Sequence, residues 1–144
     1  MAEESRIIAV DSLVANEFEV QIDGETLLGI FRVEGLSTFL LDDNGERVSV
    51  PFRLIKMVQR DGNNVFNSWL RETLKGGTAR PRRTVAIVAI DDGVETRRWT
   101  VNNAWIASVS YSPFDSASSE MVEEIVTIAY DSIEESWPAT PGLE

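Results

Sequence analysis

The stretch that decides the fold is RRTVAIVAIDDGVETRRWTVN, residues 82–102. Two runs rich in β-branched and apolar residues flank Asp92-Gly93, a dipeptide that readily adopts the positive φ angles of a tight turn. The pattern predicts a β-hairpin. Its first strand is apolar at successive positions rather than at alternate ones, so we expect both faces of that strand to be covered.

Similar signals occur on both sides of this hairpin. Residues 17–22 alternate between polar and apolar side chains, and Asp23-Gly24 precedes a second predicted strand over 26–33. Asn44-Gly45 predicts a further hairpin within residues 39–50. Three more strands are predicted, over residues 52–60, 104–112 and 121–130.

One segment has helical periodicity. Phe66, Trp69, Leu70 and Leu74 fall at positions i, i+3, i+4 and i+8, which places them on one apolar stripe. An asparagine at 63 or 64 caps the start and Gly76-Gly77 follows the end, so the helix is predicted over about 64–75. Strands at hairpin spacing with a single mid-chain helix predict a mainly β fold, a barrel or sandwich of antiparallel strands flanked by that helix.

The length of 144 residues is that of one ordinary domain, and no internal repeat or boundary interrupts it. We expect a single domain over 1–144, with an N-terminal segment over 1–15 and a loose C-terminal tail over 136–144. The acidic N-terminus lacks the basic and apolar regions of a signal peptide, and no apolar run reaches the length of a membrane span. The expectation is therefore synthesis in the cytoplasm without membrane insertion.

Composition excludes several classes of chemistry. The chain has no histidine and no cysteine, which rules out disulfides, thiolate or imidazole metal ligands, and nucleophiles activated by histidine. The formal net charge of −11 argues against specific nucleic-acid binding, which needs clustered basic residues. The paired carboxylates of LDDNGE and IDDG coincide with predicted turns and lack the ligand spacing of a calcium loop. No cofactor or metal is expected.

Three glutamates, Glu120, Glu123 and Glu124, could form an acid–base group, but no second catalytic element accompanies them. On a strand, Glu120 and Glu124 share a face with apolar residues, so each needs a partner. An arginine of the same or a neighbouring chain is the predicted partner. The five arginines between positions 80 and 98 favour surface ion pairs or salt bridges between chains over a nucleic-acid patch.

Trp99 and Trp105 bracket a predicted hairpin corner. The favoured interpretation is core packing with each indole N–H bonded to nearby backbone. The alternative is an anchor in a protein interface.

Four segments of the sequence follow one another in the order that is typical of one protein family. They are FEVQIDG followed by GIFRVEGL; LIKMVQRDGNNVFNSWL, with Trp69 inside its helix; VAIVAIDDGVETRRWTVNNAW, which ends in Trp99, Asn103, Ala104 and Trp105; and FDSASSEMVEEIVTIAYDSIE, with Glu120 and Glu124. Taken together, residues 16–134 resemble the phage tail-tube protein family of contractile phage tails and injection systems. They are more distantly similar to the Hcp proteins of type VI secretion.

The resemblance implies a β-barrel-like fold with one helix, assembling into six-membered rings that stack into a hollow conduit for cargo. It implies a structural protein without catalytic residues. The implied partners are other copies of the chain, a sheath protein, a baseplate or spike protein and a tube-terminating cap. A tube initiator that forms the first ring on the spike is a close alternative. A small-ligand-binding β-barrel and a hydrolase that uses Glu120 and Glu124 are alternatives from other classes.

Charge and position indicate which residues lie between chains. Family members use the region between Leu36 and Phe52 to reach the neighbouring ring, so Arg47 and Phe52 are predicted ring-to-ring residues. Contacts between chains are also predicted for Arg97, Arg98, Glu120 and Glu124.

Overall fold

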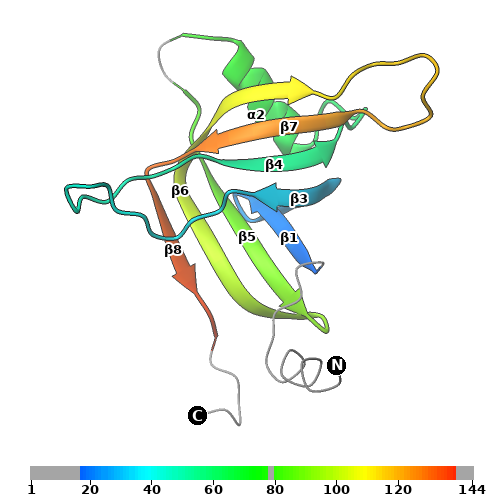
Figure 1. Cartoon of the computed structure of the whole chain (residues 1–144). Coiled ribbons are helices and arrows are strands. Elements are labelled where there is room, and N and C mark those ends of the chain that lie inside the picture. Colours follow the sequence, from blue (N-terminus) through cyan, green and yellow to red (C-terminus); the bar gives the residue numbers. More distant parts are fainter. Residues whose placement is uncertain (1–16, 78–79, 139–144) are drawn as a thin grey trace, which may run out of the picture.

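A computed structural model describes residues 17–77 and 80–138. Its elements (Figure 1) are β1 (Phe18–Ile22), β2 (Glu25–Leu27), β3 (Ile30–Glu34), β4 (Phe52–Met57), α2 (Val65–Leu74), β5 (Arg83–Asp91), β6 (Val94–Tyr111), β7 (Glu123–Ala129) and β8 (Ser132–Ser136). The predicted mainly β fold with one flanking helix is confirmed. The predicted helix bounds of 64–75 agree with α2 to within one residue at each end.

Every strand pair is antiparallel, and one strand belongs to two sheets. The first half of β6 lies between β5 and β8, and its second half pairs with β7. We call β2, β1, β5, the first half of β6 and β8 the five-stranded sheet. We call β3, β4, β7 and the second half of β6 the four-stranded sheet. Figure 1 shows β5 and β6 sweeping together from the bottom of the molecule before β6 turns toward β7.

The aspartate-glycine turns form where they are predicted. Asp23 and Asp92 have φ angles of 51° and 52°, and the glycine after each is also positive, as a tight hairpin turn requires. The strand predicted over 26–33 is instead two strands, β2 and β3, which lie in different sheets. The chain changes sheet at Gly29, whose φ of 86° favours glycine.

The predicted hairpin corner between Trp99 and Trp105 does not exist, because β6 runs through both residues. Between the pairs Val85–Val101 and Arg83–Ala104, β6 contains one more residue than β5, and Asn103 there has a φ of 53°. An extra residue in one strand bends it, and asparagine tolerates the left-handed region better than most residues. Asn103 thus supplies a bend rather than a turn, and β6 leaves one sheet for the other.

A single cluster of buried side chains lies between the two sheets and the helix. Its fully buried members come from β1 (Val20, Ile22), β4 (Phe52, Leu54), β5 (Val85, Ile87), β6 (Val101, Ala104, Ile106), β7 (Val126, Ile128) and α2 (Phe66, Trp69). Asn64 caps the helix by accepting a hydrogen bond from the Asn67 N–H at 2.8 Å. Leu74, the last member of the predicted apolar stripe, is instead 75% exposed.

Both faces of β5 are covered, as its sequence predicts. Val85 and Ile87 face the core, whereas Ala86 and Val88 are buried on the opposite face. Val88 lies between Glu19 and Arg98 on the neighbouring strands. Long polar side chains therefore flank this face. Among the described residues, it is these side chains that cover the face, and no second layer of helices or strands does so.

Other predicted boundaries shift. The hairpin expected within residues 39–50 is a turn with one β-bridge between Leu41 and Arg47. The strand predicted over 52–60 ends at Met57, and the one predicted over 121–130 begins at Glu123. Strand β8 is not predicted, and its last residue, Ser136, falls in the expected loose tail. The N-terminal segment 1–15 and residues 139–144 of that tail lie outside the described residues.

The bend at Asn103 gives a test of the fold. Asn103→Gly should leave the free energy of unfolding nearly unchanged, because glycine adopts positive φ without strain. Asn103→Val should lower it by about 1–3 kcal/mol, because a β-branched residue is strained at that φ. Urea unfolding of both variants measures the difference. Equal stability of the two variants would contradict the assigned backbone.

Candidate assembly surfaces

A buried ion pair joins the two central strands of the four-stranded sheet. The Lys56 side chain is 0% exposed and its Nζ lies 2.7 Å from Oε1 of Glu124, which is 4% exposed. Lys56 also donates to the Met57 carbonyl at 2.9 Å, and its ammonium lies 4.8 Å from the centre of the Phe66 ring. The Tyr111 hydroxyl donates to the other oxygen of Glu124 at 3.2 Å. The charges of this pair are thus matched inside the chain.

Glu124 therefore has a partner, as its position on an apolar face predicts, but the partner is a lysine rather than an arginine. Glu120 does not share that face, because it lies in the exposed loop before β7 begins. Phe52 is 1% exposed and packs against Tyr130, with ring centres 5.9 Å apart. Both side chains are thus buried within the chain, and the predicted contacts of Phe52 and Glu124 with a neighbouring chain stay predictions.

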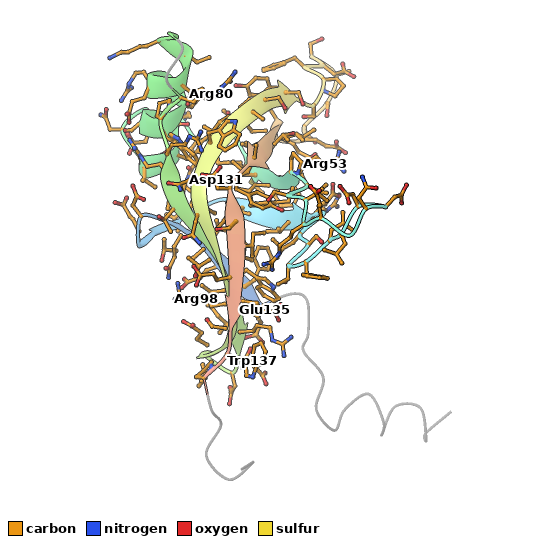
Figure 2. All side chains as sticks on the ribbon, turned by 90° about the vertical axis from the view of Figure 1, so that its left-hand side faces the viewer. Arg53, Arg80, Arg98, Asp131, Glu135 and Trp137 are labelled. Carbon is orange, nitrogen blue, oxygen red and sulfur yellow. The ribbon has the colours of Figure 1, made fainter. Side chains whose placement is uncertain are left out.

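The other residues predicted to lie between chains are at the surface. Arg97 pairs with Glu135 at 3.0 Å, and its guanidinium lies 4.9 Å from the centre of the Trp137 ring. Arg98 binds Glu95 through two hydrogen bonds of 2.9 and 2.8 Å. Figure 2 shows Arg98, Glu135 and Trp137 on the lower part of the molecule, away from Arg53. The interface roles of Arg97, Arg98, Arg47 and Glu120 stay predictions.

These contacts change two ionisation equilibria. Hydrogen bonding from Arg98 lowers the pKa of the Glu95 carboxyl. Burial raises the pKa of the Tyr111 hydroxyl, and the negative charge of Glu124 raises it further. Both shifts follow from contacts within the chain, so neither indicates a catalytic group.

The tryptophans of the motif differ in environment. Trp69 is fully buried and its indole N–H donates to the Pro81 carbonyl at 3.0 Å. The Trp99 indole donates to the Thr38 hydroxyl at 3.0 Å, so its partner is a side chain rather than the expected backbone. Trp105 is half-buried, and the Arg82 guanidinium lies 4.0 Å from its ring centre. Core packing thus describes Trp69 and Trp99 better than Trp105.

The four-stranded sheet ends in two edges that have no partner among the described strands. One edge is β3, which pairs only with β4. The other is the second half of β6, from Trp105 to Tyr111, which pairs only with β7. Unpaired strand edges are templates for pairing with another chain.

The face of this sheet that points away from the core is polar except at its centre, where Ile55 and Ile125 lie side by side on β4 and β7. The register aligns Glu34, Arg53, Thr127 and Ser108 in one row across the four strands. Arg32, Ile55, Ile125 and Ser110 form the next row. Within the first row, Arg53 and Glu34 form an ion pair at 2.6 Å. This face therefore suits contact with water.

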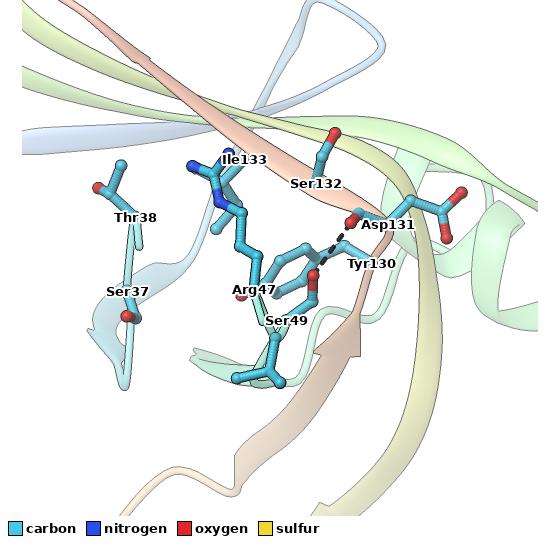
Figure 3. Close-up of a pocket in the computed structure, with 9 residues that line it drawn as sticks. Ser37, Thr38, Arg47, Ser49, Tyr130, Asp131, Ser132 and Ile133 are labelled. Carbon is cyan, nitrogen blue, oxygen red and sulfur yellow. Dashed lines mark hydrogen bonds between the residues drawn. The ribbon is translucent and has the colours of Figure 1, made fainter. Parts of the chain in front are cut away.

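Residues 37–51, which we call the arm, project beyond the sheet between β3 and β4 (Figure 1). Hydrogen bonds hold the base of the arm: Thr38 donates to Glu135 at 2.6 Å, Ser49 to the Asp131 carbonyl at 3.0 Å, and Tyr130 to the Val50 carbonyl at 2.7 Å. Figure 3 shows Ser49 and Asp131 at the small cavity between the arm and β8. Its volume of about 50 Å³ is far below that of a ligand pocket.

Metal and membrane sites have no support in the described residues. Within residues 17–77 and 80–138, no group of three or more acidic side chains is placed to hold a metal ion. In the same residues, no helix combines the length and the apolar character that a membrane span requires.

The buried ion pair can be tested by its stability. Lys56→Met should lower the free energy of unfolding by about 3–5 kcal/mol, because it leaves the Glu124 carboxylate buried without its partner. The double variant Lys56→Met/Glu124→Leu should recover most of that loss. Arg53→Met, which removes an exposed pair on the same strand, is the matched control and should cost less than about 1 kcal/mol. A Lys56→Met variant as stable as this control in urea unfolding would refute the pair's role.

Several solved structures share this fold. A chain of the PVC sheath-tube complex of an extracellular contractile injection system aligns with a TM-score of 0.72 and 19% identity, covering 93% of this chain and 97% of that one. A chain of the anti-feeding prophage baseplate gives 0.73 and 13%, covering 89% and 97%. Hcp1 from Salmonella typhimurium gives 0.56 and 11%, covering 85% and 87%. At these identities the similarity shows the fold.

Comparison with curated proteins gives no significant match. The family model of the T4-like virus tail tube protein gp19 matches residues 45–134. This match covers more than half of the chain and includes α2, β5, β6, β7 and the motif from Trp99 to Trp105. The chain therefore belongs to the T4-like virus tail tube protein family.

Proposed function

We propose that this chain is a structural tube subunit that assembles into closed six-membered rings, which stack into a hollow conduit. The observation that carries the proposal is the pair of unpaired edges on the four-stranded sheet. Because the sheet has an even number of antiparallel strands, its first strand β3 and its last strand β6 run in opposite directions. A second copy placed beside the first would thus continue the antiparallel alternation from β6 of one chain to β3 of the next.

Head-to-tail pairing of this kind closes into a ring when the rotation between copies divides a full turn. Six copies would give a continuous barrel of about 24 strands. A strand spacing of about 4.8 Å and a tilt of about 40° correspond to a barrel about 48 Å across between backbones. Such a barrel is too wide for side chains to fill, so its centre would be an open channel.

The polar outer face of the four-stranded sheet would line that channel. Hydroxyls of Ser108, Ser110 and Thr127 would face the lumen together with the ion pair of Arg53 and Glu34. The apolar core face would remain on the outside of the channel wall, packed against the five-stranded sheet and the helix. The wall would then be wet on one side and buried on the other, as a one-sided antiparallel sheet permits.

In this proposal the chain acts by assembling into a tube and catalyses no reaction. Partners would be a sheath protein around the tube, a baseplate or spike protein at one end and a cap at the other. The sheath-tube, terminator, cap and baseplate structures that share the fold support this set of partners. The chain would act in an assembled tail or injection particle.

A tube initiator is the second candidate, because a chain of the anti-feeding prophage baseplate aligns as well as chains of the tube complex and cap. The remaining alternatives have less support. For a ligand-binding barrel, the cavity between the arm and β8 is too small at about 50 Å³. A hydrolase that uses Glu120 and Glu124 would need both carboxylates at one site, whereas Glu124 is buried and paired with Lys56.

Negative-stain electron microscopy of the purified chain, with native mass measurement on the same sample, tests this proposal. We expect six-fold rings or hollow tubes, and a mass six times that of the 16.1 kDa chain for the smallest closed species. Long tubes would favour the main subunit, and one or two rings would favour the initiator. A chain that stays monomeric at high concentration and on a baseplate template would refute both.

A further inference from the structure

The two edges of the four-stranded sheet that lack a described partner carry exposed apolar sites at the same end of the sheet. Tyr111, the last residue of β6, lies in the same row of the register as Ile30, the first residue of β3. Residues 112–122, which we call the β6–β7 loop, begin at that end, and Figure 1 shows them projecting beyond the strands. Each edge therefore presents a site of its own to the chain that lies beside it.

The β6–β7 loop carries the most exposed large apolar side chain of the described residues, Phe114, which is 81% exposed. Hydrogen bonds hold the loop on both sides of this residue. The Ser112 N–H donates to the Glu123 carbonyl at 3.0 Å. The Ala117 N–H donates to the Asp115 carboxylate at 2.9 Å. The loop is thus ordered while its aromatic ring is exposed, which lowers the ordering cost of a contact made through that ring.

The edge at β3 carries an open groove with a volume of about 540 Å³. Its lining residues are Phe31, Met57, Ser119, Glu120, Met121 and Glu123. Met121 is 69% exposed, and Phe31 and Met57 are each more than a third exposed. Methionine side chains adapt to the shape of a partner, which suits a protein-binding surface. Phe114 of the same chain does not line this groove, which leaves its apolar side chains open to another chain.

The tilt of the strands decides what lies beside the groove in the proposed ring. A row of residues perpendicular to tilted strands changes height as it crosses the sheet, so each copy is staggered along the strands relative to the last. Hydrogen bonds from the Met57 and Val58 amides to the residues before β3 and β7 give the order of these strands as seen from the core face. With that order and the right-handed twist of sheets, the next chain's β3 is displaced by a few residues toward the C-terminal end of β6. The start of that β3 then lies beside the β6–β7 loop.

The charges beside the two sites are complementary. The Arg32 side chain in β3 is 60% exposed and lies 3.4 Å from Glu34, which Arg53 binds more closely at 2.6 Å. Arg32 is therefore only weakly compensated within its own chain. Asp115 in the β6–β7 loop forms no ion pair in the part of the chain that the structure describes. The staggered joint would place these opposite charges on facing surfaces of neighbouring chains.

We propose that Phe114 of each chain inserts into the groove of the next chain around the ring, beside Phe31 and Met57. In the same contact Asp115 faces Arg32 of the next chain. This inference rests on the proposed ring, and it assigns a side-by-side contact to two surfaces outside the paired edges. Because the two surfaces differ, each chain gives one loop and receives another, so the series of contacts closes only with the ring. An aromatic anchor in an apolar pocket is the kind of contact that carries much of the energy of an interface.

The absence of cysteine allows a direct test by cross-linking. The variant Leu28→Cys/Ser116→Cys places one thiol just before β3 and one in the β6–β7 loop, and it leaves Phe114 and the groove lining intact. A short bifunctional thiol reagent applied to its assembled rings should give a ladder of linked chains that ends at six. The matched control is Leu28→Cys/Val94→Cys, because Val94 is 63% exposed at the β5–β6 turn, away from both sites. This control should give no ladder.

Substitution of the aromatic anchor gives a second readout. Phe114→Asp should raise the chain concentration at which half of the rings dissociate by about tenfold or more, because it places a charge in an apolar groove. Val94→Asp is the matched control and should leave that concentration unchanged. Both side chains are exposed in the single chain, so neither variant should change the midpoint of urea unfolding of the dissociated chain.

Ring formation by the wild-type chain separates this contact from the proposed function. If rings form but the Leu28→Cys/Ser116→Cys variant gives no ladder, the contact is refuted and the ring proposal stands. The same holds if Phe114→Asp rings dissociate at the wild-type concentration. If the wild-type chain forms no rings at all, both proposals fail.

Discussion

The structure depends on one strand that belongs to two sheets. β6 runs for 18 residues, pairs on both sides over its first half and on one side over its second half. The bend at Asn103 makes this possible, because it carries β6 away from β5 without ending the strand. The consequence is a four-stranded sheet whose two edges have no partner among the described strands. Such edges expose a monomer to aggregation, whereas a tube subunit can use them for assembly. The bend in β6 thus accounts both for the two-sheet fold and for the edges through which the proposed assembly would form.

The buried ion pair also bears on how β4 and β7 are aligned. Lys56 and Glu124 are directly opposite each other on β4 and β7, and the next pair in the register is Met57 with Glu123. The ammonium of Lys56 also holds the Met57 carbonyl at 2.9 Å. Removing one buried charge would therefore disturb the end of β4 as well as the core. A buried pair contributes little net stability over apolar packing, but it fixes which residues face each other across the two strands.

Local sequence signals predict much of this architecture. Aspartate-glycine turns, alternating polarity and the stripe through Phe66 and Trp69 predict the hairpins and the helix, since these depend on residues close in sequence. The continuity of β6 is not predicted, because the feature at Asn103 is a backbone angle that sequence spacing does not distinguish from a turn. β8 is missed because its alternation of Ile133 with polar residues is too short to separate from a tail. The lysine partner of Glu124 lies 68 residues away, and only the strand register brings the two together. The free edges likewise follow from the order of the strands in the sheet, which no local sequence pattern contains.

Hydrogen exchange of the dissociated and the assembled protein, followed by mass spectrometry, tests the central claim most directly. In β3 and residues 105–111, the amides that point away from β4 and β7 should exchange quickly in the dissociated chain. They should become protected on assembly, because each edge gains a hydrogen-bonded partner. Amides of β5 and of the centre of β7 should be protected in both states. If the two edges exchange equally fast in both states while another surface becomes protected, the chains do not assemble through the edges of the four-stranded sheet.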